Sequence, residues 1–229
     1  MKEWFILMLQ DSASPMMEWM MMFHDFTLLI NLIIVVLILW IIMNVSLNKF
    51  IVLMVESQEV EIIWTIIPIF TLVILGVPSM KILYMLDEVY LPFLTVKVVG
   101  HQWYWSYEYS DFMSKSMDSY MVKDINLSSF RLLDSTENLV LPMDVQIRFL
   151  ISSEDVIHSF AVPSVGIKVD AVPGRLNQGG VNMSIPGFHL GQCSEICGMA
   201  HSFMPIVVEG SGVKDFMNYM EEFMEEFIE

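Results

Sequence analysis

Two long runs without a charged residue near the N-terminus constrain the fold more than any other feature of this chain. They cover residues 26–48 and 62–80, which are 23 and 19 residues long. A helix needs roughly 20 apolar residues to cross the hydrocarbon core of a bilayer. Pro68 and Pro78 lie in the second run, where neighbouring groups in a membrane can satisfy the freed carbonyls. The runs predict a transmembrane helical hairpin over residues 26–80, after an N-terminal segment 1–25; a buried core helix is the alternative for each run.

The composition agrees with membrane insertion. Hydrophobic residues make up 55% of the chain, above the usual share of a soluble domain. Residues 1–25 carry four acidic residues against a single lysine, and the apolar stretch WFILML is short for a cleavable signal. We therefore expect the first span to act as its own anchor, with both termini on the same side of the membrane. Lys2 and Lys49 are too few to indicate which side.

The pattern changes from residue 81 to the C-terminus. Charges occur throughout, and apolar stretches shorten to strand length between turn residues, as in LTVKVVG, DVQIRFLIS, SFAVPSVGIKV and MPIVVEG. About 150 residues suffice for an independent core. The pattern predicts an aqueous all-β sandwich or barrel over residues 81–229, ending in an acidic amphipathic helix, VKDFMNYMEEFMEEFIE.

The aqueous region is strongly acidic. It contains nine Lys and Arg against twenty Asp and Glu, a net charge of −11. This balance argues against nucleic acid as a partner and favours a basic partner, whose encounter the field would accelerate. A solvated surface that only keeps the domain soluble is the alternative.

One short segment, GQCSEICGMAHSFMP at residues 191–205, gathers both cysteines of the chain with a histidine and a methionine. In a helix, Cys193 and Met204 would lie roughly 16 Å apart along the axis, too far for bonds of about 2.0 to 2.3 Å to one metal centre. Gly and Pro also punctuate the segment. We therefore predict a loop that curls Cys193, Cys197, His201 and Met204 around a metal.

The ligand types favour copper. Thiolate with imidazole suits copper or zinc, and an added thioether such as Met204 is typical of cupredoxin electron-transfer sites. A second histidine is needed, and His158 lies between two strand-like runs from which it could reach the loop. Three alternatives stay open at this point: a structural zinc site, a disulfide, and a membrane-anchored thiol oxidoreductase or copper chaperone.

Several motifs together resemble one family over nearly the whole chain. They are HQWYWSYEY (101–109), SSEDVIHS (152–159), DAVPGRLNQ (170–178), GQCSEICG with HSFMPIVVE (191–209), and QEVEIIWTIIP (58–68) in the second span. This combination resembles subunit 2 of cytochrome c oxidase. The resemblance implies a cupredoxin-like domain that carries a dinuclear copper A centre.

The resemblance also implies a role for each matching residue of the centre. Cys193 and Cys197 would bridge two copper ions, and His158 and His201 would each bind one. Met204 would be a weak ligand of one copper, and the main-chain carbonyl of Glu195 a ligand of the other. The Glu195 carboxylate would bind a magnesium ion shared with the catalytic subunit, because carboxylate oxygens suit that hard ion.

The implied reaction is electron relay. Cytochrome c, a basic protein, would dock on an acidic face that includes Asp111, Glu154 and Asp155. Electrons would enter at Trp103, with Tyr104 and Trp105 close by, and pass from the copper pair to a haem-copper catalytic subunit that reduces oxygen to water.

Two further expectations concern the membrane. Glu61, at the start of the second span, is assigned by the resemblance to the mouth of a proton pathway; an interfacial acid is the alternative. The missing signal peptide and the 21 methionines, typical of an AT-rich organellar genome, indicate the mitochondrial inner membrane, with a bacterial plasma membrane as the alternative. The copper domain and both termini would then face the intermembrane space.

Overall fold

The computed structural model of the chain describes residues 10–48, 56–88, 91–112, 116–123 and 130–225. Contacts divide it into two compact units. One unit runs from Trp19 to Met85 and is helical; the other is a β domain built from Leu86–Glu229 together with Met1–Glu18.

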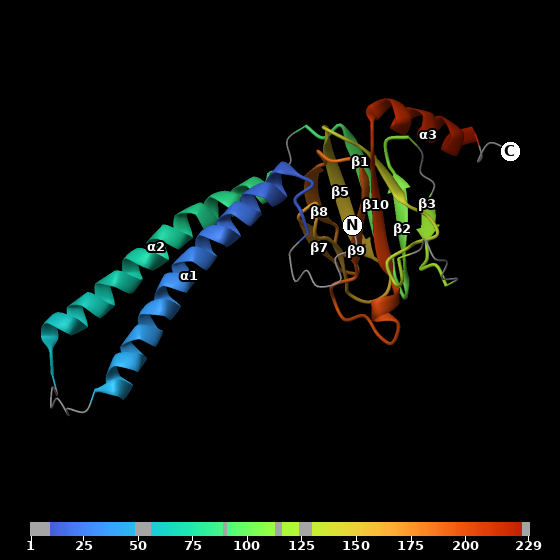
Figure 1. The fold of residues 1–229 in the computed structure, drawn as a ribbon. Coiled ribbons are helices and arrows are strands. Elements are labelled where there is room, and N and C mark those ends of the chain that lie inside the picture. The colour runs from blue at the N-terminus through green and yellow to red at the C-terminus, as the bar shows by residue number, and fades with distance from the viewer. Residues whose placement is uncertain (1–9, 49–55, 89–90, 113–115, 124–129, 226–229) are drawn as a thin grey trace. The chain divides into compact units, whose positions relative to one another are not determined.

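The helical unit consists of α1 (Pro15–Leu47) and α2 (Gln58–Asp87), which run in opposite directions (Figure 1). Both are long and apolar enough to cross a membrane, and neither contains a buried residue. Helix α1 begins well before the predicted span at residue 26, because Ser14 caps it by accepting the Met17 amide at 3.0 Å and Pro15 suits the first helical position. The charge-free run marks the apolar part of this helix and not its start.

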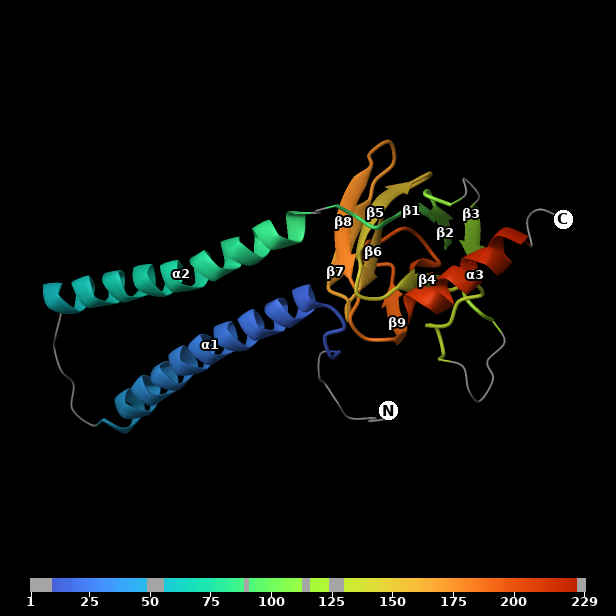
Figure 2. The ribbon, with the colours of Figure 1, turned by 90° about the horizontal axis from the view of Figure 1, so that it is seen from above.

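The β domain contains ten strands among the described residues (Figures 1 and 2). They are β1 (Leu94–His101), β2 (Tyr104–Tyr109), β3 (Ser116–Ser119), β4 (Leu139–Pro142), β5 (Gln146–Ser153), β6 (His158–Val162), β7 (Ile167–Ala171), β8 (Asn177–Asn182), β9 (Gly187–Gln192) and β10 (Pro205–Ser211).

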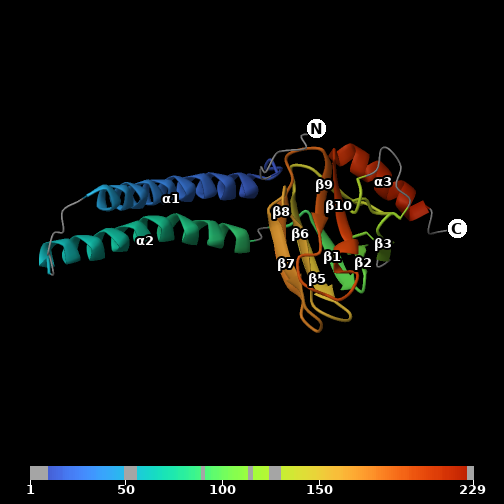
Figure 3. The same cartoon turned by 60° about the horizontal axis from the view of Figure 1, so that its bottom comes forward.

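The strands form a five-stranded sheet in the order β3-β2-β1-β5-β8, a three-stranded sheet β4-β10-β9 and the pair β6-β7 (Figure 3). Most neighbours are antiparallel, but β1 pairs with β5 and β10 with β4 in parallel. Alternate residues of β5, including Phe149, point into one core with Leu141 of β4 and Val208 of β10. The predicted all-β sandwich with a C-terminal helix is confirmed.

The stretch SFAVPSVGIKV is a hairpin and not one strand. Strands β6 and β7 pair antiparallel from His158–Ala171 to Val162–Ile167. Pro163 follows directly after β6 and has no amide hydrogen to donate to a ladder, so the chain turns there. The turn leaves His158 at the free end of the hairpin, a placement that matters for the site below.

The terminal helix α3 (Val213–Glu225) closes one side of the domain. Phe216, Met220 and Phe223 recur at helical spacing and are buried, and Phe216 packs on Tyr109 with ring centroids 6.2 Å apart. The amphipathic pattern of the sequence thus forms a packed helix through Glu225; the last four residues of the predicted helix lie outside the described residues.

A small clasp holds the segment before α1 to the β domain. The Ala13 amide donates to the Ser164 carbonyl at 2.7 Å, and the Ser184 amide donates to the Ala13 carbonyl at 2.9 Å. His189 bridges the two loops of the clasp: its Nδ1 is 3.1 Å from the Ser164 hydroxyl and its Nε2 is 3.0 Å from the Ile185 carbonyl. Since a carbonyl only accepts, Nε2 carries the hydrogen and Nδ1 accepts from Ser164.

We expect His189→Phe to lower the free energy of unfolding of the β domain by about 2 kcal/mol or more, because it leaves a buried hydroxyl and a carbonyl without their partner. Denaturant unfolding of the full chain in detergent measures this. His24→Phe, the same change at an exposed position of α1, is the control and should shift the value by less than about 0.5 kcal/mol. Equal stabilities for the two variants would contradict the bridging role of His189.

Candidate metal centre

The site forms where β6 and β9 approach each other closely. His158 begins β6, and Cys193 directly follows β9. The Ser194 amide donates to the Ser159 carbonyl at 3.1 Å, which ties the cysteine loop to the start of β6. At Gly191, a Cβ atom would collide with the carbonyl oxygen of Ala161. The two backbones therefore approach closely only because residue 191 has no side chain.

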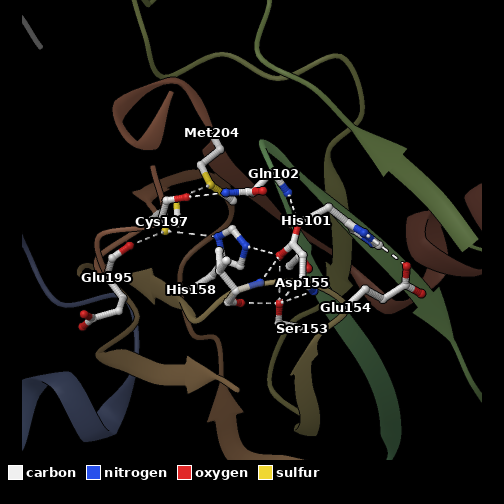
Figure 4. A network of polar contacts seen from close by, with 12 residues as sticks. His101, Gln102, Ser153, Glu154, Asp155, His158, Glu195, Cys197 and Met204 are labelled. Carbon is white, nitrogen blue, oxygen red and sulfur yellow. Dashed lines mark hydrogen bonds and ion pairs between the residues drawn. The ribbon is translucent and has the colours of Figure 1, made fainter. Parts of the chain in front are cut away.

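The six residues predicted as copper ligands lie together at this close approach. Figure 4 labels four of them: His158, Glu195, Cys197 and Met204. The Cys193 sulfur is 3.9 Å from His158 Nδ1 and 3.3 Å from the Glu195 carbonyl oxygen. The Cys197 sulfur is 3.5 Å from His201 Nδ1 and 3.6 Å from the Met204 sulfur. Donor atoms of His158, Cys193 and Cys197 all fall within 4.8 Å of one another, a spacing that suits a shared metal site.

Asp155 fixes the orientation of the His158 ring. The Asp155 carboxylate accepts a hydrogen bond from His158 Nε2 at 2.8 Å, so the hydrogen lies on Nε2 and the lone pair of Nδ1 faces the sulfurs. Burial alone lowers the pKa of His158, but its hydrogen bonds with Cys193 and Asp155 raise the pKa above its ordinary value. A carboxylate behind a histidine in this way is the usual second partner of a metal ligand.

The two thiols differ in acidity. Burial raises the pKa of the Cys193 thiol, but hydrogen bonding with His158 and backbone groups outweighs it and lowers the pKa to about 7. Burial and the neighbouring Cys193 charge raise the pKa of Cys197 to about 12. One thiolate therefore forms readily in this pocket, whereas a second requires a cation to compensate its charge.

The donor set fits copper. Two thiols, two imidazole nitrogens and a thioether are soft ligands, and the Met204 side chain is buried with its sulfur turned to Cys197. Zinc would use the cysteines and histidines but has no need for the thioether. Both cysteines are free thiols in the structure, so the disulfide alternative is not what the structure contains.

The three aromatic residues predicted along the electron path occupy different environments. Trp103 is half-buried, with its indole against Gly198 of the cysteine loop. Tyr104 is also half-buried and stacks between His101 and Tyr120. Trp105 is completely buried and meets the ring of His158 edge-on at 5.9 Å. Of the two tryptophans, only Trp103 lies partly at the surface.

The three acidic residues predicted to dock a partner do not lie at the same end of the β domain. Asp111 lies past the end of β2 remote from Tyr104 and accepts the Thr95 amide at 2.6 Å. Six or seven strand residues separate it from the copper end, roughly 20 Å. Glu154 is at the copper end, its side chain 73% exposed and 3.5 Å from His101 Nδ1. Asp155 is also there, but its carboxylate is held by His158 and by the amides of Gln102 and Val156.

Two residues of the site were missed by the sequence analysis. The Gln102 side chain donates to the Cys197 carbonyl at 2.8 Å, and Gly198 adopts a φ of +126° beside it. Gln102 directly precedes Trp103 in the HQWYWSYEY motif, but polar residues in aromatic strands are common and no spacing links it to the cysteine loop. The contact arises only in the folded domain.

The carboxylate of Glu195 lies apart from the sulfur cluster, and Glu61 belongs to the helical unit. The Glu195 side chain points away from the sulfurs while its carbonyl faces Cys193 (Figure 4). Glu61 lies in the first turn of α2 and lines a groove with Gln58 and Thr65. A magnesium role for Glu195 and a proton role for Glu61 stay predictions.

Fold and site together define a class of protein: a cupredoxin-like β domain with a buried thiolate and imidazole metal site, joined to two apolar helices of membrane-spanning length.

Comparisons with known proteins give the family. Residues 94–211 match the model for cytochrome c oxidase subunit II, periplasmic domain, and residues 2–82 match the model for its transmembrane domain. Cytochrome c oxidase subunit 2 of Ctenocephalides felis is 49% identical over 223 residues, covering 96% of this chain and 98% of the relative. The same subunit of Simulium vittatum is 51% identical over 223 residues, covering 96% and 97%.

Solved structures agree with these matches. The crystal structure of the periplasmic domain of subunit II of cytochrome oxidase (CoxB) of Bradyrhizobium japonicum superimposes with a TM-score of 0.57 and 41% identity, covering 61% of this chain and 99% of that one. The chain belongs to the cytochrome c oxidase subunit 2 family. It is a membrane protein with two spans and the electron-transfer subunit of cytochrome c oxidase.

We expect proton release on copper(I) binding to the metal-free chain to fall as the pH rises through about 7. Below this pH both thiols hold protons that the metal must displace, about two per chain, and His158 adds to the release. Above it Cys193 is already a thiolate, because its pKa is about 7, and release from the thiols approaches one. Anaerobic titration in a pH-stat at about pH 6 and about pH 8.5 measures the difference; equal release at both would contradict the lowered pKa of Cys193.

Proposed function

We propose that the chain holds a dinuclear copper centre that takes electrons from cytochrome c and passes them to a haem-copper partner subunit. The observation that carries the proposal is the convergence of two thiol sulfurs, two imidazole nitrogens, a thioether and the Glu195 carbonyl where β6 approaches β9. Two copper ions held by these groups would supply a one-electron acceptor.

The protein part of this function is fixed geometry in a dry shell. His158, Cys193, Cys197 and Met204 are all buried, and Asp155 holds His158 with Nδ1 toward the sulfurs. A site whose ligands are held by packing and hydrogen bonds needs little rearrangement when its charge changes. His201 is the one side-chain ligand of this set that is only half-buried, at the start of the 3-10 turn His201–Phe203.

Electrons enter at Trp103 in this proposal. Its half-buried indole packs on Gly198, next to the bridging ligand Cys197, so one edge meets solvent and the other meets the copper loop. Trp105 and Tyr104 have supporting positions in the proposal, the first against His158 and the second in the aromatic stack with His101.

The docking face for the basic cytochrome c centres on Glu154. The side chain is exposed at the copper end of the domain, as docking requires. Asp155 contributes negative charge from the same turn while it holds His158. Asp111 joins the proposal only as a distant contributor to the field, because it lies at the opposite end of the β1-β2 ladder.

The membrane and magnesium roles complete the proposal. Glu195 binds magnesium through its carboxylate at the junction with the catalytic subunit, while its carbonyl faces copper. Glu61, in the first turn of α2, lies at the mouth of a proton pathway into the catalytic subunit. The chain resides in the mitochondrial inner membrane, with the copper domain and both termini in the intermembrane space; its membership in a family with two spans and a separate aqueous domain supports this placement.

The first experiment is to load the full chain with copper and record metal content and the electron paramagnetic resonance spectrum. We expect about two coppers per chain that share one unpaired electron, because two bridging thiolates join the metals. Cys193→Ser should abolish this spectrum. One zinc per chain, or copper that binds equally well without Cys193, would refute the proposal.

We also expect Trp103→Phe to slow electron uptake from cytochrome c by about tenfold or more, because the indole that joins the surface to Gly198 is lost. Reduction by a small soluble reductant should change little, since the copper ligands stay in place. Trp40→Phe in the apolar part of α1 is the matched control. Stopped-flow reduction measures both rates; uptake from cytochrome c equal to that of the control would exclude Trp103 as the point of electron uptake.

A further inference from the structure

Gln102 connects two copper ligands that come from different parts of the chain. Its side-chain amide donates to the Cys197 carbonyl at 2.8 Å, and its backbone amide donates to the Asp155 carboxylate at 2.6 Å. The same carboxylate accepts His158 Nε2 at 2.8 Å. Figure 4 shows this continuous path of hydrogen bonds from Cys197 through Gln102 and Asp155 to His158.

The side chain of Gln102 also lies beside the indole of Trp103 on the backbone of Gly198. A Cβ atom at Gly198 would lie 3.2 Å from Gln102 Nε2 and 3.2 Å from Trp103 Cζ2. Both groups therefore rest on the residue that follows Cys197, in space that only glycine leaves open. Among the described residues, the Gln102 side-chain amide is thus the group beside Trp103 that donates a hydrogen bond to the Cys197 carbonyl.

We propose that Gln102 is a positioning residue, which fixes the Cys197 backbone against Trp103 and aligns it with His158 through Asp155. The inference rests on the proposed copper function and extends it to a residue outside the ligand set. An N–H dipole directed at the cysteine loop also favours the more negative, reduced state of a metal centre, because it partly compensates the added charge.

The test uses the full chain in detergent, loaded with copper, with Gln102→Met and Gln178→Met compared. Met keeps the length of Gln but has no donor, and Gln178 is an exposed glutamine on β8. We expect Gln102→Met to change the copper hyperfine pattern. It should also shift the electron equilibrium with a reference redox protein by about fivefold toward the oxidised centre, the factor for one hydrogen bond. Electron uptake from cytochrome c should slow as well.

A second measurement covers the case in which Gln102→Met does not take up copper. In the metal-free wild-type chain, the side-chain amide protons of Gln102 should exchange with solvent about tenfold more slowly than those of Gln178, because one of them is bonded to Cys197. Equal exchange would overturn the proposal without any reference to copper.

The outcomes separate this proposal from the function on which it rests. If the wild-type chain does not form the two-copper spectrum, the proposed function fails, and the amide exchange still tests the Gln102 contact. If the wild-type chain forms it and Gln102→Met matches Gln178→Met in spectrum, equilibrium and uptake rate, only the positioning role of Gln102 is overturned.

Discussion

The close approach of β6 and β9 at Gly191 is the constraint on which the rest of the site depends. His158 and Cys193 are separated by more than thirty residues in the sequence, yet their donor atoms lie 3.9 Å apart. A side chain at residue 191 would meet the Ala161 carbonyl and push the strands apart. Because protein interiors are close-packed, that displacement would carry through to the ligands at the ends of both strands. One missing side chain thus sets the ligand spacing.

Charge compensation is the second requirement of this site. Two thiolates in a buried pocket repel each other, and the opposed pKa directions of Cys193 and Cys197 express this conflict. The metal-free domain relieves it by keeping one thiol protonated. Asp155 adds a further negative group close by, which stays ionised because hydrogen bonds from His158, Val156 and Gln102 lower its pKa against the effect of burial. The surroundings thus favour a bound cation over an empty pocket.

The sequence predicts the parts of this protein that depend on composition and spacing. The two apolar runs, the all-β domain and the amphipathic end of the chain are local patterns, and each corresponds to an element of the fold. The cysteine loop could be identified because its ligands lie within twelve residues. The sequence did not reveal the split of residues 159–169 into β6 and β7, since both strands are apolar and Pro163 is the main interruption.

Residues whose role depends on contacts between distant segments could not be predicted from the sequence. Asp155 was predicted as a surface acid that docks the partner. It lies three residues before His158, and no sequence pattern distinguishes a docking acid at that position from one that bonds to the histidine ring. Gln102 carried no signal at all, since its bond to Cys197 spans 95 positions. Asp111 was predicted to share an acidic face with Glu154 and Asp155, but the extended strand β2 carries it to the other end of the ladder.

The separation of Asp111 from Glu154 changes how the acidic surface of this domain should work. A net charge of −11 over residues 81–229 acts at long range and speeds the approach of a basic partner from any direction. Electron transfer is local, however, and needs the partner beside Trp103. Charges screened beyond about 8 to 10 Å at physiological salt cannot hold the partner there from the far end of a strand. The final orientation therefore depends on the few groups at the copper end, where Glu154 is exposed and Asp155 is already bonded to His158. Attraction is a property of the whole domain, and alignment is a property of one turn.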